Sequence, residues 1–115
     1  MIYLVAKVLQ EESDTLSDYS LEYTTAMLMN LTLRSKGKVK CEEIDLNIIK
    51  ILSELMQNDN LQVRSYINGT LYSILTRTKL QQRAKEIDLE HMLLALMEHS
   101  QEQFKKQIEY ILEQM

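Results

Sequence analysis

The chain contains 115 residues, enough for one domain with a substantial core but too few for two independent catalytic domains. Apolar residues make up 45% and charged residues 26%, which excludes a disordered tail and a collagen-like fibre. The net charge of −4 argues against a dedicated nucleic-acid-binding protein. With no proline and only two glycines, the composition predicts an all-α protein and argues strongly against a β-sheet protein.

Targeting and membrane signals are weak in this sequence. Apolar runs are far shorter than the ~20 residues that cross a bilayer, so we expect no membrane insertion. The opening stretch, Met1 to Leu9, lacks the basic region and the small-residue cleavage site of a signal peptide. The single cysteine, Cys41, cannot form an internal disulfide, which is typical of a reducing compartment. We therefore expect a cytoplasmic protein.

The spacing of apolar residues predicts eight helices along the chain. They cover about residues 1–11, 17–33, 38–44, 46–57, 61–76, 80–86, 88–98 and 101–115. Polar side chains that can cap helices precede several of them: Ser17, the run from Asn58 to Asn60, and Ser100, which has the capping-box spacing with Gln103.

Helical periodicity also predicts which faces are buried. Three helices share one apolar pattern, and the predicted buried residues are Thr24, Met27, Leu28 and Leu31, then Val63, Ile67, Thr70, Leu71 and Ile74, then Phe104, Ile108, Ile111, Leu112 and Met115. Two helices between them are apolar nearly all round, with Leu46, Ile48, Ile49, Ile51, Leu52, Leu55 and Met56 in one, and Leu89, Met92, Leu93, Leu96 and Met97 in the other. Ile2, Val5 and Leu9 predict a further core face at the start of the chain.

An internal repeat organises these helices. A shift of 43 positions places Tyr23 on Tyr66. The same ungapped register matches Leu28 with Leu71, Arg34 with Arg77, Lys36 with Lys79, Ile49 with Met92, Cys41 with Ala84, and the run from Glu43 to Leu46 with the run from Glu86 to Leu89. This period lies within the ~40–47 residues of HEAT and armadillo repeats.

The repeat predicts a right-handed α-solenoid of about two and a half three-helix units within one domain, 1–115. We divide it into a partial repeat at 1–33, a complete repeat at 34–76 and a terminal repeat at 77–115. A HEAT array with two helices per unit is the alternative architecture. Gly69 aligns with Ala26, so we interpret it as a site of close helix approach, although Asn68 and Gly69 together also form a hairpin signal.

The helix that contains Leu28, Met29, Asn30 and Leu31 resembles the third helix of armadillo repeats, which carries an Ala-Leu-x-Asn-Leu core. Longer stretches are similar to a narrower family, the LisH-domain and armadillo-repeat proteins of ciliary basal bodies. These stretches are DTLSDYSLEYTTAMLMNLTLR at 14–34, VRSYINGTLYSILT at 63–76 and QIEYILEQ at 107–114. Because the chain has no LisH motif, we expect it to be a segment of a longer protein.

This resemblance implies a non-catalytic scaffold that acts through other proteins at the basal body or centriole and supports cilium assembly or stability. It implies protein partners, with ciliary microtubule-associated proteins and tubulin as candidates, and no small-molecule substrate, nucleic acid or cofactor. In armadillo repeats, third-helix asparagines grip an extended peptide. Asn30 matches that position and Ser73 replaces it one repeat later, so both are candidate partner-binding residues. Ala26 and Gly69 replace the groove tryptophan of nuclear-import receptors, which argues against binding of nuclear-localisation peptides.

Basic residues recur in register and predict a ridge along one edge of the stacked repeats. They are Arg34, Lys36, Lys38, Lys40, Arg77, Lys79, Arg83 and Lys85. Two interpretations are open. Cations near helix C-termini are stabilised by the helix dipole, and the same ridge could dock an acidic partner such as a tubulin tail.

Residues for catalysis or metal binding are not grouped in the sequence. His91 and His99 are too far apart for the i, i+4 spacing of a helical zinc site. Cys41 is expected to be a small buried residue. We therefore expect no enzyme activity, no metal and no catalytic residues.

Overall fold

The computed structural model describes residues 1–43 and 47–115, and every regular element in this part of the chain is an α-helix. The helices are α1 (Ile2–Glu12), α2 (Asp18–Leu31), α3 (Ser35–Lys40), α4 (Ile48–Leu55), α5 (Leu61–Ile74), α6 (Thr78–Glu86), α7 (Leu89–Glu98) and α8 (Glu102–Gln114). The predicted all-α class is confirmed.

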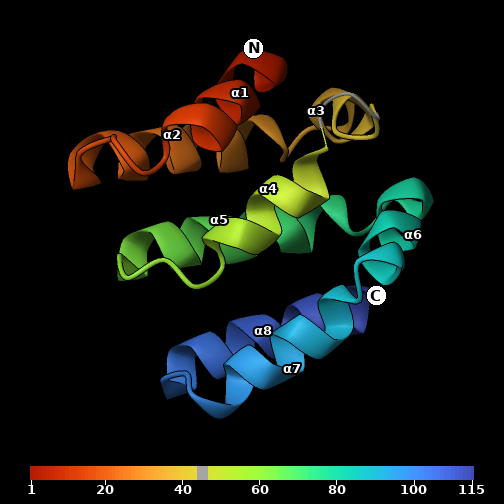
Figure 1. Cartoon of the computed structure of the whole chain (residues 1–115). Coiled ribbons are helices and arrows are strands. Elements are labelled where there is room, and N and C mark those ends of the chain that lie inside the picture. The colour runs from red at the N-terminus through yellow and green to blue at the C-terminus, as the bar shows by residue number, and fades with distance from the viewer. Residues whose placement is uncertain (44–46) are drawn as a thin grey trace.

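The helices lie in three tiers, each made of a pair (Figure 1). Helix α1 packs on α2, α4 on α5, and α7 on α8, while α5 lies between α2 and α8. The short helices α3 and α6 lie along one edge, at the right of Figure 1. Because each tier covers the apolar face of its neighbour, the arrangement is that of an armadillo-like solenoid.

The predicted core is largely confirmed. The apolar stripe of α5 is buried, and so is almost the whole surface of α4 together with Met56 that follows it. The first helix buries Ile2, Val5 and Leu9. The last helix buries Phe104, Ile108 and Ile111, and its Leu112 and the following Met115 are partly buried against the core. Leu46, also expected in this core, lies outside the described residues.

Two core predictions are wrong. In α2 the buried residue is Thr25 and Thr24 is only half-buried. Thr25 tolerates burial because its hydroxyl donates a 2.8 Å hydrogen bond to the Leu21 carbonyl oxygen. Met92 in α7 is 39% exposed instead of buried. Helix α4 packs on α1, α5 and α6, whereas α7 packs on α6 and α8, so α7 has less helical surface to cover it.

The change of register is visible in the helix starts. Helices α2 and α5 begin 43 residues apart, as do α3 and α6, but α4 and α7 begin 41 apart, as do α5 and α8. Met92 therefore corresponds to Ile51 and not to Ile49. Of the matched run Glu43 to Leu46, residues 44–46 lie outside the described residues.

Both central helices, α4 and α7, begin directly after a residue in the left-handed backbone conformation. Asn47 has φ 48° and Asp88 has φ 57°. Asparagine and aspartate adopt this conformation more readily than other non-glycine residues, because their short polar side chains can bond locally. The same left-handed backbone conformation therefore precedes both α4 and α7.

The two glycines are both sites of close helix approach. A Cβ on Gly69 would lie 2.7 Å from Met29 Sδ in α2, which confirms the interpretation made from the repeat. Gly37 is buried inside α3, where a Cβ would collide with the main-chain carbonyl of Leu31 at the end of α2. The helix expected at 38–44 therefore starts earlier, at Ser35. Because Gly37 has no side chain, α3 can pack closely against the end of α2.

Helix capping follows the sequence at two of three predicted positions. The Ser17 hydroxyl accepts from the Ser20 amide at 3.2 Å, and Asn60 Oδ1 accepts from the Gln62 amide at 3.0 Å. The predicted capping box at Ser100 is wrong. Its hydroxyl donates instead to the Leu96 carbonyl oxygen at 2.7 Å, so Ser100 closes α7 and does not open α8.

Candidate functional site

The eight predicted basic residues all belong to α3, α6 or the residues that begin these helices. We call this set the basic edge; it comprises Arg34, Lys36, Lys38, Lys40, Arg77, Lys79, Arg83 and Lys85. The two short helices bring these residues to the same side of the molecule (Figure 1). Their electrostatic environments differ, however, between α3 and α6.

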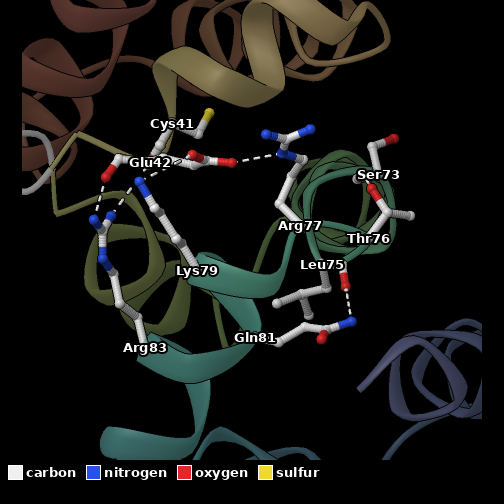
Figure 2. Close-up of polar contacts among 9 residues, drawn as sticks. All are labelled: Cys41, Glu42, Ser73, Leu75, Thr76, Arg77, Lys79, Gln81 and Arg83. Carbon is white, nitrogen blue, oxygen red and sulfur yellow. Dashed lines mark hydrogen bonds and ion pairs between the residues drawn. The ribbon is translucent and has the colours of Figure 1, made fainter.

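Three cations, Arg77 just before α6 and two within it, make contacts within the chain (Figure 2). Arg77 Nε lies 2.5 Å from Glu42 Oε1, and Lys79 Nζ lies 4.0 Å from Glu42 Oε2. Arg83 donates to the main-chain carbonyl oxygens of Cys41 and Glu42, immediately after α3. These side chains hold the end of α3 against α6, so the α6 half of the basic edge is first of all a contact between repeats.

The α3 half of the basic edge is more open. Lys40 pairs with Glu43 at 3.0 Å, one helical turn away, and both side chains are about half exposed. Arg34 and Lys36 are exposed and Lys38 is half-buried. Within residues 1–43 and 47–115 these three make no ion pair, and the same holds for exposed Lys85 at the end of α6.

The two candidate groove residues occupy equivalent positions near the ends of α2 and α5. Asn30 is exposed and Ser73 is half-buried. Ser73 lies apart from the contacts of Glu42 in Figure 2, and its main-chain carbonyl oxygen accepts a 3.0 Å hydrogen bond from Thr76. Neither residue lines the aromatic hollow formed beside Tyr72 and Tyr110.

That hollow lies between α5 and α8 and has a volume of about 370 Å³. We call it the α5–α8 hollow; it is lined by Ser65, Asn68, Gly69, Tyr72, Gln107 and Tyr110. The rings of Tyr72 and Tyr110 meet edge to face, with centroids 6.3 Å apart and planes at 70°. Both rings remain about half exposed, so each keeps surface available for contact.

Two amides join α5 and α8 at the same place. Asn68 Nδ2 donates to Gln107 Oε1 at 2.8 Å, and Asn68 is only 4% exposed. Asn68 Oδ1 has no hydrogen-bond partner within the described part of the chain, although it is buried. An unpaired buried acceptor is uncommon in native proteins and calls for an explanation.

Sequence reasoning missed this hollow and also Gln81. Tyr72 corresponds to Glu113 and Tyr110 to Gly69 once the register changes, so neither tyrosine repeats and the periodic pattern could not reveal them. Gln81 in α6 donates to the Leu75 carbonyl oxygen at 2.7 Å and to that of Gln114 at 2.8 Å. It thereby ties the ends of α5 and α8 together.

Cys41 is fully buried. Burial, and then the negative charge of Glu42, raise the pKa of its thiol to about 12. The thiol therefore stays protonated near neutral pH and is a poor nucleophile. The prediction of a small buried residue, equivalent to buried Ala84, is confirmed.

His91 and His99 are both exposed. Across residues 1–43 and 47–115, histidine, cysteine and acidic side chains form no group of three that could hold a metal ion. In the same described ranges, every helix is too short or too polar to cross a membrane.

Comparison with known proteins now assigns the family. A family model described as "LisH domain-containing protein ARMC9, ARM repeats" matches residues 1–115. The chain belongs to this armadillo-repeat family. Armadillo repeats generally form protein-interaction modules that are not catalytic, so we describe the chain as an armadillo-type interaction module.

Relatives named LisH domain-containing protein ARMC9 agree with this assignment. The protein of Danio rerio is 40% identical over 104 residues, covering 90% of this chain and 13% of the relative. Those of Bos taurus and Homo sapiens are each 37% identical over all 115 residues, covering 17% and 14% of their own lengths. The chain therefore spans a small part of these relatives. No solved structure matches it significantly.

Proposed function

We propose that the chain is the interaction segment of a non-catalytic scaffold that acts at the ciliary basal body or centriole, within the cytoplasm and cytoskeleton. The resemblance to basal-body proteins that combine a LisH domain with armadillo repeats supports the location. The family assignment supports the interaction role.

One structural observation carries the interaction role. Helices α2, α5 and α8 stack side by side and contribute buried residues to the core, and an open hollow remains between α5 and α8. An aromatic hollow on a rigid helical scaffold is suited to holding a segment of another protein.

Proximity labelling with the full-length parent protein in ciliated cells tests the location. We expect basal-body and centriolar proteins to be enriched over a cytosolic control of similar abundance. Enrichment of only nuclear-import or cadherin-junction proteins would overturn the proposal.

A second candidate function is direct binding to tubulin through the basic edge. The exposed, unpaired state of Arg34 and Lys36 among the described residues favours it, because these cations can meet an acidic tail without breaking an existing ion pair. The α6 residues Arg77, Lys79 and Arg83 contribute less, since they already contact Glu42 and its neighbour.

Microtubule co-sedimentation at two salt concentrations tests this second function. We expect Arg34→Glu with Lys36→Glu to weaken binding by about tenfold and to reduce its salt dependence. Lys105→Glu with Lys106→Glu, which reverses two charges on α8, is the matched control. Equal binding by all variants would dismiss the basic edge as a tubulin site.

A further inference from the structure

We propose that the α3 surface, which comprises Leu33, Arg34, Lys36, Val39 and Lys40, binds to the face of an anionic lipid bilayer. The cations pair with lipid headgroups, and the two apolar side chains enter the boundary between headgroups and acyl chains. The protein contacts one face of the bilayer and does not cross it. This inference goes beyond the proposed scaffold role, and it assigns the cations of α3 to a ligand other than tubulin.

Two neighbouring hollows join these residues into one surface. The first is lined by Arg34, Lys36 and Lys40, together with apolar side chains from the start of α1 and the end of α2. The second is lined by Lys36, Val39 and Lys40, together with Lys79 of α6 and two glutamates that follow α3. Lys36 and Lys40 line both hollows and lie one helical turn apart. The cations and Val39 therefore share one side of α3.

The apolar side chains of the α3 surface depart from the repeat. Val39 is 48% exposed and Leu33 is 60% exposed. The equivalent positions one repeat later hold Gln82 and Thr76, which are polar and exposed. Stacking of the repeats therefore does not require an apolar side chain at either position. Exposed apolar side chains beside cations are typical of surfaces that lie on a membrane, whereas an acidic protein tail pairs chiefly with the cations.

The cations of the α3 surface are available to an anionic ligand. Arg34 and Lys36 are exposed and make no ion pair within residues 1–43 and 47–115. Glu43 offsets part of the charge of Lys40, with which it pairs at 3.0 Å, while Glu42 is already paired with the start of α6. Each cation near an anionic bilayer strengthens binding about fivefold, so a few cations with two apolar contacts give weak, reversible attachment.

The distribution of charge over the whole molecule orients this surface toward a bilayer. Glu12, Asp14 and Asp18 surround the turn from α1 to α2, and Glu98 and Glu102 flank the turn from α7 to α8. Both turns lie at the edge opposite to α3 and α6 (Figure 1). Because an anionic bilayer repels the acidic edge and attracts the basic edge, the chain approaches with the basic edge foremost.

Co-sedimentation of the 115-residue chain with lipid vesicles tests this inference. We expect binding to phosphatidylcholine vesicles that contain phosphatidylserine and no binding to phosphatidylcholine alone. Arg34→Glu with Lys36→Glu should weaken binding by about tenfold or more. Lys105→Glu with Lys106→Glu on α8, the matched control, should bind as the unchanged chain does. Equal binding with and without phosphatidylserine, or no binding to either vesicle, would overturn the inference.

A second variant separates the bilayer from tubulin. Leu33→Thr with Val39→Gln introduces the residues found at the equivalent exposed positions beside and within α6, so it keeps the charge and should keep the fold. We expect vesicle binding to weaken about fivefold, because less apolar surface enters the bilayer, and microtubule binding to stay unchanged. Unchanged vesicle binding by this variant would show that charge alone attracts the chain, and the inference would fall.

Nuclear magnetic resonance with vesicles that carry a spin-labelled lipid provides a readout without substitutions. We expect the methyl signals of Leu33 and Val39 to broaden. Those of Leu61, 43% exposed at the start of α5 on the opposite edge, should stay sharp. Equal broadening at Leu61, displacement of the chain by free phosphoserine, or pairing of two copies through their basic and acidic edges in place of vesicle binding would each contradict the inference.

Discussion

Glu42, just beyond α3, places a carboxylate oxygen 2.5 Å from Nε of Arg77, the N-cap residue of α6. The two residues are 35 positions apart and join successive short helices. Only 13% of the Glu42 side chain is exposed, so this pair is better shielded from solvent than an ordinary surface ion pair. It explains why a recurring basic residue at this position can stabilise the stack without binding any partner.

Replacing Glu42 should weaken the stack. Glu42→Gln removes the charge that pairs with Arg77 and Lys79, and we expect a loss of about 1 kcal/mol in the free energy of unfolding, less at high salt. Urea denaturation at low and high salt measures both effects. Glu43→Gln is the control, since its pair with Lys40 is about half exposed and should change stability by less than about 0.5 kcal/mol. Equal effects of the two variants would contradict a stabilising role for the pair of Glu42 and Arg77.

The two glycines should differ in how well they tolerate replacement by alanine. Gly37→Ala forces a Cβ against the Leu31 main-chain carbonyl, which cannot move without displacing α2, so we expect a loss of more than about 2 kcal/mol. Gly69→Ala meets only the flexible Met29 side chain and gains helix propensity of about 1 kcal/mol, so its net effect should be near zero or stabilising. Thermal unfolding compares them directly. Gly37→Ala no more destabilising than Gly69→Ala is the result that would count against this account.

Cys41 should make stability depend on pH in the alkaline range. Because burial raises the thiol pKa from 9.0 to about 12, the unfolded chain loses this proton at a lower pH than the folded chain. The stability that comes from a neutral thiol is therefore fully present below pH 9 and falls as pH rises toward 12, by at most about 1.4 kcal/mol per pH unit.

Comparison with Cys41→Ala isolates this effect from the titration of other groups, and Ala84 shows that alanine fits the equivalent site. Above pH 9 the unfolding free energy of the unchanged protein should fall relative to that of Cys41→Ala. A constant difference up to pH 11 would show that the thiol is not shielded from solvent in the folded state.

The amide pair of the α5–α8 hollow should show non-additive energetics. Gln107→Leu leaves Asn68 Nδ2 without its partner, and we expect a cost of about 1–3 kcal/mol. The double variant Asn68→Leu with Gln107→Leu removes both polar groups and should recover most of that loss. A double-mutant cycle by urea denaturation measures the coupling. Additive losses would mean that the two amides do not depend on each other.

The helices and most of the core could be predicted because they follow from spacing along a single helix. Val63, Ile67 and Leu71 recur on one face, and that face is buried. The error at Gly37 arises because a second helix, α2, decides where α3 begins. The error at Ser100 is local, since its hydroxyl donates to the Leu96 carbonyl oxygen at the end of α7 and does not cap α8.

The candidate site was harder to predict for the same reason. Sequence analysis correctly placed Arg77 and Arg83 on the basic edge. Sequence alone does not show that Glu42 pairs with Arg77, or that main-chain carbonyl oxygens accept hydrogen bonds from Arg83. Tyr72 and Tyr110 meet only because two helices stack after the register changes. Such a pair has no periodic signature, so the α5–α8 hollow becomes visible only in three dimensions.

The left-handed residues Asn47 and Asp88 impose a rule on any attempt to engineer longer arrays from this unit. A consensus module would need asparagine, aspartate or glycine at this one step, whatever freedom its outer surface allows, because a β-branched residue there would be strained in every copy. The strain energy would add up with the number of modules, so a cost that one copy tolerates could unfold a long array.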